Sequence, residues 1–304
     1  MELKNKFLSV VTVYSQQNHH LLEKSLLTIS GQSGCNFTRV IIIDTYGNLD
    51  LNNKLFNRKS SLDVTIIKKL ADISYYDALN VGVSETTTEW VSFLELGNSY
   101  VSKNTIEEIA AVIKSNDADI YYGNSQKVIN SSSDKYKTIG AKPIKTISKA
   151  QPFDFQSCIF RTSIMKSFKF NPLYKYAAEY ELLVRLFRGE ISFCYLPFAI
   201  SKSSFSKSLD ERLEKLFIIS KYFGEEALKN SKYFERYVRA SAYEVKRLMP
   251  LYEKIKKTEN LIEEQKSILK IRQSEYAQIK ETKVYKFGRK IDGLLSNILW
   301  RADK

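Results

Sequence analysis

Apolar residues follow two alternating patterns over residues 7–196. Continuous apolar runs at 7–13, 40–43 and 90–94 predict strands buried on both faces of a sheet. Between these runs, apolar residues recur every three or four positions, which predicts amphipathic helices. The alternation predicts an α/β fold of the Rossmann-like kind, with a mainly parallel central sheet flanked by helices. The other expected strands are 64–67, 120–122 and 191–196, and the expected helices are 21–29, 75–83, 106–113 and 177–188.

The second half of the chain becomes helical after a polar stretch. Residues 130–150 are rich in lysine and serine, and we expect a loop or an edge hairpin there. From 208 the pattern is helical, and Pro250 is expected to close that helix. Apolar residues spaced by three and four then predict a coiled-coil-like helix over 251–283. Polar residues interrupt the spacing, so a single solvated helix is the alternative. The apolar positions are Leu251, Ile255, Ile262, Leu269, Tyr276 and Ile279, and the interruptions are Thr258, Gln265 and Arg272.

The last segment, 284–304, is a basic amphipathic tail. Leu294, Leu295 and Ile298 share one helical face, and basic residues lie at both ends of it. This composition is typical of an interfacial helix on an anionic membrane. The alternative is that the apolar face docks on the chain's own domain or on a partner helix. The pattern thus predicts four parts: a domain over 1–207, a helical extension over 208–250, the coiled-coil-like helix over 251–283 and the tail over 284–304.

The charge of the chain narrows the choice of partners. The 304 residues include 47 Lys and Arg against 34 Asp and Glu, a net charge of +13. Residues 1–150 are nearly balanced at +2, whereas 151–304 carry +11. The excess suits an anionic membrane surface or a lipid diphosphate, and without a recognition motif we expect no nucleic-acid partner. No signal peptide and no membrane-spanning run is evident, so the expected location is the cytoplasm, including the inner face of the membrane.

Residue counts exclude several kinds of chemistry. Cys35, Cys158 and Cys194 are far apart and odd in number, which argues against a disulfide framework or a zinc site. The only histidines are adjacent, at 19 and 20, so a three-histidine metal site cannot form. Glycine-rich phosphate loops and nucleophile elbows do not occur in the sequence. Catalysis is therefore expected to depend on carboxylates at the carboxyl ends of strands, where α/β sheets bind ligands.

Several sequence motifs resemble those of one enzyme family. Individually they are weak, but their shared order and spacing are more specific. They are SVVTVYS (9–15), IIIDTYGNLD (41–50), YYDALNVGVSETTTEWVSFLELGN (75–98), DADIYYGN (117–124) and AAEYELLVRLF (177–187). Together they resemble the family 2 inverting glycosyltransferases with the GT-A fold, especially the bacterial surface-polysaccharide branch. The resemblance covers roughly residues 7–205.

The resemblance implies a hexosyltransferase-type enzyme. Such an enzyme moves a sugar, with inversion, from a nucleoside diphosphate donor to an acceptor. For this branch the implied donor is a UDP-sugar, and the implied acceptor is a lipid-linked or oligosaccharide chain in cell-surface polysaccharide synthesis. The sugar and the linkage depend on the shape of loops around 125–160 and 198–210, which the sequence does not give.

Five residues match positions that bind the nucleotide sugar in the family. Thr12 and Tyr14 are implied to lie near the base and ribose. Asp44 matches the first aspartate of a pair whose carboxylate accepts hydrogen bonds from the base, although threonine replaces the second member. Asp77 and Asn80 match an element beside the sugar or the diphosphate. The ordinary alternatives are a turn or cap residue at Asp44, a helix N-cap at Asp77 and a surface amide at Asn80.

The metal motif departs most from the family pattern. Family members carry two carboxylates after the fourth strand, because Mg²⁺ or Mn²⁺ prefers oxygen ligands and neutralises the diphosphate. This chain has Glu95 and Asn98 there, so only one carboxylate remains. The resemblance implies a divalent metal at these two residues, in a weakened site. The alternatives are that basic residues neutralise the diphosphate without metal, or that the metal site is lost.

Glu179 is the strongest candidate for a catalytic residue. At about 100° per residue it shares a helical face with three leucines, whereas Glu181 and Arg185 fall on the opposite face. A carboxylate on an apolar face costs free energy unless it is paired or has a role. The family places its catalytic base here, which implies that Glu179 takes the proton of the acceptor hydroxyl. The alternative is a helix-terminal carboxylate paired with a lysine such as Lys175.

A second hypothesis keeps the fold but not the activity. The replacements at Thr45 and Asn98 suggest a degenerate nucleotide-sugar-binding or scaffolding subunit, whose coiled coil and tail recruit other enzymes to a membrane. In either case the coiled-coil-like helix predicts a homo-oligomer. Residues 155–157 and Arg161 resemble the family's polar stretch before the acceptor-side loop, and a strand edge with an Arg stem lying along apolar surface is the alternative.

Overall fold

The computed structural model divides the chain into two units, residues 1–236 and 237–304, which are described separately. The tail expected over 284–304 lies outside the described residues. The residues that the structure describes are 6–14, 19–33, 38–47, 49, 63–68, 73–130, 133–204, 208–234 and 242–281.

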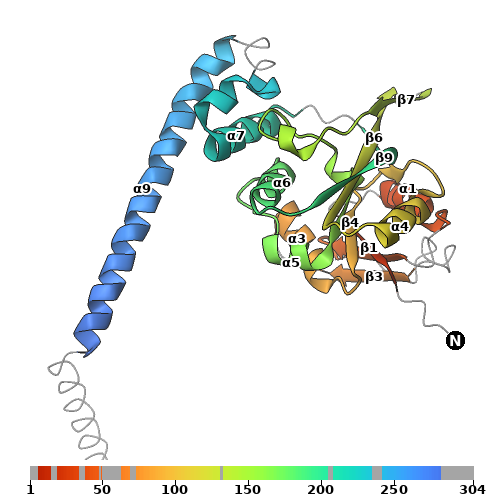
Figure 1. Cartoon of the computed structure of the whole chain (residues 1–304), viewed down its shortest axis with the longest axis horizontal. Coiled ribbons are helices and arrows are strands. Elements are labelled where there is room, and N and C mark those ends of the chain that lie inside the picture. The colour runs from red at the N-terminus through yellow and green to blue at the C-terminus, as the bar shows by residue number, and fades with distance from the viewer. Residues whose placement is uncertain are drawn as a thin grey trace, which may run out of the picture. The chain divides into compact units, whose positions relative to one another are not determined.

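Within the described residues, the first unit is built on one nine-stranded sheet (Figure 1). The first half of this sheet is parallel, and the predicted strands are confirmed there. Their continuous apolar runs are buried because helices cover both faces of the sheet. In order across the sheet, the strands are β3 (Asp63–Lys68), β2 (Thr38–Asp44), β1 (Leu8–Tyr14) and β4 (Trp90–Phe93).

The second half of the sheet is mixed, and here the sequence predicts less. The strand expected at 191–196 runs on to Ser203, and the strand expected at 120–122 runs on to Asn130. The extensions pair mainly with each other and with the edge hairpin, so backbone pairing carries polar residues into the sheet. The short strand β8 is not predicted. The strands are β8 (Cys158–Arg161), β6 (Ile120–Asn130), β9 (Phe193–Ser203), β5 (Ser99–Tyr100) and the hairpin strand β7 (Ser133–Ile139).

Helices cover both faces of the sheet, and β1 shows how the core is divided. Val11 and Val13 pack with α3 and α6 on one face, whereas Leu8 and Val10 pack with α1 and α4 on the other. The α/β fold expected from the sequence is therefore confirmed. The helices are α1 (His19–Ser30), α3 (Tyr75–Glu85), α4 (Thr105–Ser115), α5 (Thr162–Phe168) and α6 (Ala178–Arg188), with single 3₁₀ turns η2 (Ile144–Thr146) and η3 (Phe155–Ser157).

The helix α7 (Leu209–Lys229) belongs to the first unit. Ser208 caps it, and Gly224 interrupts its helical geometry at φ 83°. Ile218 and Ile219 are buried in the same core cluster as the leucines of α6. The segment expected as a helical extension over 208–250 is thus divided between the two units.

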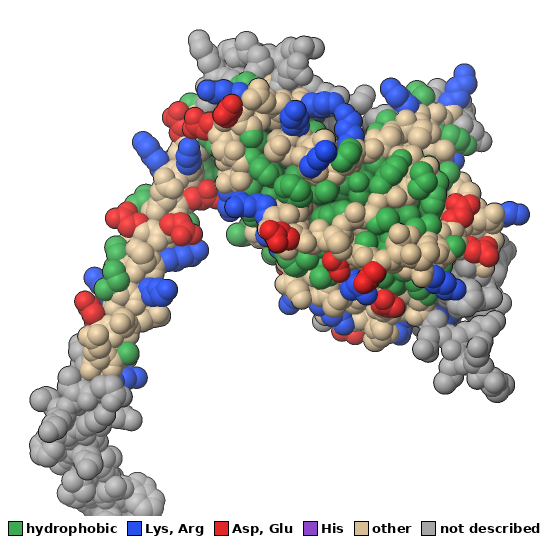
Figure 2. All heavy atoms as spheres, viewed as in Figure 1, with side chains coloured by type: hydrophobic (Ala, Val, Ile, Leu, Met, Phe, Trp, Pro, Cys, Tyr) green, Lys and Arg blue, Asp and Glu red, His purple; other side chains and the backbone are tan. Residues whose placement is uncertain are grey.

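The second unit contains the helix α9 (Ala242–Glu281). The expectation that a helix closes at Pro250 is wrong, because α9 runs through it. A proline removes one backbone hydrogen bond, which a long helix can tolerate at the cost of a local bend. Acidic and basic side chains are interspersed along α9, with apolar ones such as Ile255, Ile262 and Leu269 exposed between them (Figure 2). Throughout the described ranges, no helix combines the length and apolar character needed to cross a bilayer.

Candidate active site

A cleft of about 370 Å³ opens in the first unit beside the end of β4. Its walls come from α3, the segment after β4, the hairpin strands, the loop before η3, and the helices α6 and α7. The cleft collects acidic and basic side chains that are far apart in the sequence. The acids are Glu95, Asp154, Glu179 and Glu211, and the bases are Lys127 and Lys215.

The turn after β4 presents Glu95 to the cleft. Gly97 has φ +84°, a conformation that favours glycine, and this lets the chain reverse between Glu95 and Asn98. The Gln156 side-chain oxygen accepts the backbone N–H of Glu95 at 3.1 Å and the Asn98 amide at 2.8 Å. Burial raises the pKa of the Glu95 carboxyl, and the nearby Asp154 charge adds to the increase. Gln156 therefore holds both expected metal ligands in place.

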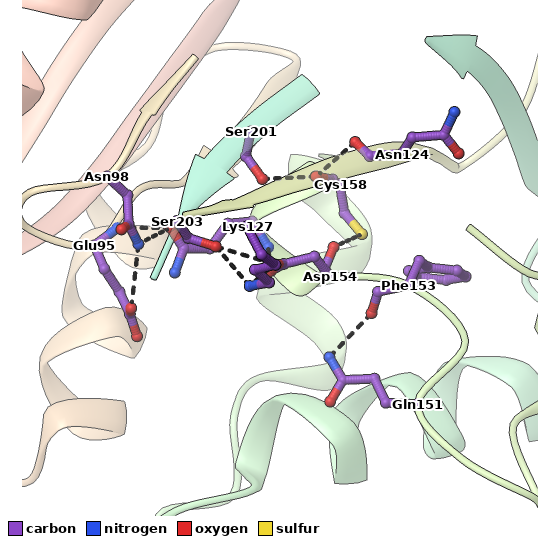
Figure 3. A network of polar contacts seen from close by, with 12 residues as sticks. Glu95, Asn98, Asn124, Lys127, Gln151, Phe153, Asp154, Cys158, Ser201 and Ser203 are labelled. Atoms are coloured by element: carbon purple, nitrogen blue, oxygen red, sulfur yellow. Dashed lines mark hydrogen bonds and ion pairs between the residues drawn. The ribbon is translucent and has the colours of Figure 1, made fainter. Parts of the chain in front are cut away.

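A second polar network lies beside this turn (Figure 3). Lys127 on β6 donates to the Asp154 carboxylate and, at 2.5 Å, to the Ser203 hydroxyl on β9. Asp154 also accepts the backbone N–H of Gln156 at 3.1 Å and so begins η3. One carboxylate thus joins the loop before η3 to the sheet and orients Gln156.

Glu179 lies in the first turn of α6 and lines the cleft. Burial raises the pKa of its carboxyl well above the ordinary value near 4.5. Repulsion from Glu95 and then Asp154 raises the pKa further, while the charge of Lys215 opposes the increase. A carboxylate with a raised pKa accepts a proton more readily, so this position suits a general base.

The expectation about the opposite face of α6 is corrected by the structure. Glu181 is only 1% exposed, more buried than Glu179, rather than lying on a solvated face. Its carboxylate accepts the Arg185 Nε at 2.9 Å and the Tyr222 hydroxyl of α7 at 2.6 Å. Because α7 covers this side of α6, the polar side chain of Glu181 is buried there, and hydrogen bonds satisfy its carboxylate.

Of the expected nucleotide-binding residues, Asp44 organises its own loop. It is fully buried, and its carboxylate accepts the backbone N–H groups of Tyr46, Gly47 and Leu49 at 2.8–2.9 Å. Asp44 therefore acts as a turn residue, which was the alternative to nucleotide binding that the sequence left open. The three bonds fix the chain at the carboxyl end of β2.

Asp77 and Asn80 also make internal contacts. The N-cap of α3 is Ser74, and Asp77 three residues later accepts the Ser74 hydroxyl at 2.7 Å. Asn80 donates to the Phe170 carbonyl at 2.9 Å and accepts the Phe170 N–H at 2.8 Å. Asn80 is therefore a bridge from α3 to the segment between α5 and α6, rather than a free surface amide.

Thr12 and Tyr14 lie near the end of β1 and outside the residues that line the cleft. Tyr14 is fully buried, with its hydroxyl 3.3 Å from His19 Nε2. Thr12 is 3% exposed, and among the described residues its hydroxyl has no hydrogen-bond partner. A buried hydroxyl without a partner is unusual, and Thr12 is the residue of this pair that retains hydrogen-bonding capacity.

The expected metal ligands lie together but do not form a two-carboxylate site. The Asn98 side chain directs its amide nitrogen toward the Glu95 carboxylate, at 3.3 Å. In the part of the chain that the structure describes, no group of three or more His, Cys, Asp or Glu is arranged to hold a metal ion. Mg²⁺ and Mn²⁺ require several oxygen ligands, so Glu95 is the one strong ligand this turn offers.

Arg161, at the end of β8, has a structural role. Its guanidinium lies 4.7 Å from the centre of the Trp90 ring and pairs with Glu89, Asp117 and Asp119. Because β8 lies inside the sheet, between β4 and β6, Arg161 is not at a strand edge, as the alternative from the sequence had it. Gln156, by contrast, reaches the cleft.

Sequence reasoning missed four charged residues of the cleft. Lys127 and Asp154 lie on either side of the polar stretch 130–150, where the sequence has no periodicity to indicate a buried side. Lys215 and Glu211 lie on α7, and Lys215 is 9% exposed. One signal was present: Lys215 precedes the buried Ile218 and Ile219 by three and four residues, which places it on the same helical face.

The strand order defines an α/β domain, and the charged cleft at the strand ends is its candidate site. No family model matches the chain, and no curated protein matches it by sequence. Solved structures match its fold. The 1–349 fragment of S. aureus TarS in complex with UDP-GlcNAc has a TM-score of 0.56 at 16% identity, covering 77% of this chain and 73% of that one. The same fragment in complex with UDP has a TM-score of 0.55 at 17% identity, covering 77% and 72%.

A further match is the mannosyltransferase PcManGT from Pyrobaculum calidifontis, in complex with GDP-Man and Mn²⁺. Its TM-score is 0.52 at 13% identity, and the match covers 95% of this chain and 84% of that one. The fold of the first unit is that of GT-A glycosyltransferases, which confirms the fold expected from the sequence motifs.

The raised pKa of Glu179 has a measurable consequence for stability. Ionisation of Glu179 is disfavoured in the folded chain, so stability is lost as the pH rises from about 4.5 through the raised pKa. We expect Glu179→Gln to be more stable than the native chain at pH 8, with a higher melting temperature, because the amide stays neutral where the buried carboxyl must ionise. Below about pH 4 the difference should vanish, since both side chains are then neutral.

Thermal unfolding followed by circular dichroism over this pH range measures the effect. Glu226→Gln, at an exposed position on α7, is the matched control and should show no comparable pH-dependent gain. A Glu179→Gln variant that is less stable than the native chain at pH 8 would contradict the assignment of a raised pKa.

Proposed function

We propose that the protein is an inverting glycosyltransferase that uses a nucleoside diphosphate sugar, with UDP as the nucleotide. The observation that carries the proposal is the carboxylate of Glu179, which faces a cleft shared with Glu95 on a GT-A fold. The acceptor is a lipid-linked or oligosaccharide chain of the cell surface. The sequence motifs support this choice of acceptor, and the fold supports the class of donor.

The proposed reaction needs one base and an open path to the sugar. Glu179 takes the proton of the acceptor hydroxyl as that oxygen bonds to the anomeric carbon. The bond from the anomeric carbon to the diphosphate oxygen breaks on the opposite face, and the nucleoside diphosphate leaves with the bonding electrons. One displacement on the face opposite the leaving group inverts the configuration of that carbon.

The donor is proposed to lie between the ends of β1 and β2 and the turn after β4. The proposed neighbours of the nucleotide are the loop organised by Asp44 and Thr12, whose hydroxyl has no partner among the residues that the structure describes. Tyr14, Asp77 and Asn80 support these segments through their buried or internal contacts. A divalent cation, when bound, would neutralise diphosphate charge with Glu95 as its carboxylate ligand.

Glu179 provides the main test of the proposed activity. We expect Glu179→Gln to lower the rate of transfer by about 10²–10⁴-fold, because the amide cannot accept the proton. The assay measures UDP released from UDP-GlcNAc and from a panel of other UDP-sugars, with oligosaccharide acceptors. Glu226→Gln should keep native turnover, and a fully active Glu179→Gln enzyme would remove the base assignment.

The second candidate function is a nucleotide-sugar-binding or scaffolding subunit without activity. It is favoured by the single carboxylate of the turn after β4 and by the internal contacts of Asp44 and Asn80. Titration calorimetry with UDP, in Mn²⁺ and in EDTA, separates the two. For the enzyme we expect binding under both conditions, with Mn²⁺ raising the affinity by less than about tenfold, since one carboxylate holds the cation weakly. Absence of UDP binding under both conditions would favour the scaffold.

Two further proposals concern partners and rest on the sequence pattern. A second copy of the chain is proposed to pair along the exposed apolar positions of α9, and 284–304 is proposed to hold the enzyme at the inner face of an anionic membrane. We expect light scattering to give a dimer that Ile262→Lys disrupts.

For the membrane proposal, we expect the chain to float with vesicles containing phosphatidylserine and not with neutral vesicles. A monomeric native chain, or equal binding to both vesicles, would contradict the respective proposal.

A further inference from the structure

The helix that carries Glu179 begins without a cap of its own. The N-cap of α6 is Ala177, whose side chain has no hydrogen-bond acceptor. The first N–H groups of a helix have no partner within it, and a serine, threonine, aspartate or asparagine usually supplies one. A helix start with alanine at this position needs an acceptor from elsewhere.

Glu214 of α7 supplies an acceptor for the N-cap N–H and for the N–H groups of the two residues before it. Its Oε1 accepts the backbone N–H of Lys175 at 2.8 Å, and its Oε2 accepts those of Tyr176 and Ala177, both at 2.7 Å. Bonds from backbone N–H groups to a carboxylate are stronger than neutral ones. The last of these amides lies two residues before Glu179, so Glu214 fixes the backbone from which the proposed base extends.

The position of α7 against α6 is fixed along its length. Ile218 and Ile219 are buried with the leucines of α6, and the Tyr222 hydroxyl donates to the buried Glu181 at 2.6 Å. Glu211, three residues before Glu214, pairs with Lys215, the residue after it, and both line the same cleft as Glu179. Glu214 thus lies on a helix that packs against α6 through buried side chains.

We propose that Glu214 is a positioning residue of the transfer site: it caps the start of α6 from α7 and so holds Glu179 in the geometry for proton transfer. This inference rests on the proposed role of Glu179 as the base. Glu214 contacts backbone amides and not the reacting atoms, so its effect is on the rate of the chemical step. A misplacement of about 1 Å at such a site can cost about 10²-fold in rate.

Glu214 also affects the charge environment of the base. The start of a helix carries partial positive charge, which stabilises a nearby carboxylate, and an anionic cap offsets that charge. Other charged groups act on Glu179 from Glu95 after β4, from Asp154 before η3, and from Glu211 and Lys215 on α7. With these groups unchanged, removal of the Glu214 charge should lower the pKa of Glu179.

The test compares Glu214→Gln and Glu214→Ala with Glu226→Gln in the full chain. Gln keeps the size of the side chain but replaces one acceptor oxygen with a donor. For a UDP-sugar that the native chain turns over, we expect Glu214→Gln to lower kcat by about 10- to 100-fold with the donor KM changed by less than about threefold. The acidic limb of its pH–rate profile should move to lower pH, which loss of stability alone would not produce.

Hydrogen exchange read by mass spectrometry gives a second measurement, which does not depend on activity. The amides of 175–181 should exchange about tenfold faster in Glu214→Gln and Glu214→Ala, and at the native rate in Glu226→Gln. Native kcat and an unmoved pH profile in Glu214→Gln would overturn the inference, even with faster exchange. Absence of turnover by the native chain would instead overturn the proposed function. A melting temperature near the native value verifies that each variant is folded.

Discussion

Charge balance in one cleft is the constraint on which the site depends. Four carboxylates share the cleft with two lysines, so the acids cannot all be neutralised by ion pairs. Lys127 pairs with Asp154, and Lys215 pairs with Glu211. The carboxyls of Glu95 and Glu179 are left with raised pKa values, each increased first by burial and then by neighbouring negative charge. The two lysines thus pair with Asp154 and Glu211, and Glu95 and Glu179 are the two carboxyls with raised pKa values.

The surrounding structure holds these groups at fixed positions. Gln156 ties the turn after β4 to η3, and Asp154 ties η3 to β6 and β9. On the other side, Glu214 and Tyr222 of α7 hold α6 at its N-cap and in its first turn. The helix α7 therefore belongs functionally to the α/β unit, although the sequence places it beyond the region of family resemblance. Polar groups that are already hydrogen-bonded within the protein need little rearrangement when a ligand binds, and this suits a preformed site.

Several residues that resemble binding residues are occupied by internal hydrogen bonds. Asp44 accepts three backbone N–H groups, and Asn80 makes two bonds to Phe170. These contacts explain why such residue types occur at strand ends and helix starts even without a ligand, since they satisfy backbone groups that the regular elements leave open. The buried hydroxyl of Thr12 differs, because among the described residues it has no partner.

The sequence by itself determined the α/β alternation, the buried strands β1, β2 and β4, and the face of α6 on which Glu179 lies. The strands follow from continuous apolar runs, because both of their faces are buried, and the helices follow from apolar residues that recur about every 3.6 positions. The strand β8 is defined by its pairing with β4 and β6, which no local pattern records. Pro250 was expected to end a helix, but α9 continues through it. Only the tertiary structure decided that Glu181 is buried under α7, that Glu214 caps α6, and that Lys127, Asp154 and Lys215 meet Glu179 in one cleft. Each of these contacts joins residues from different elements, and no local pattern records which helix or strand will cover a given side chain.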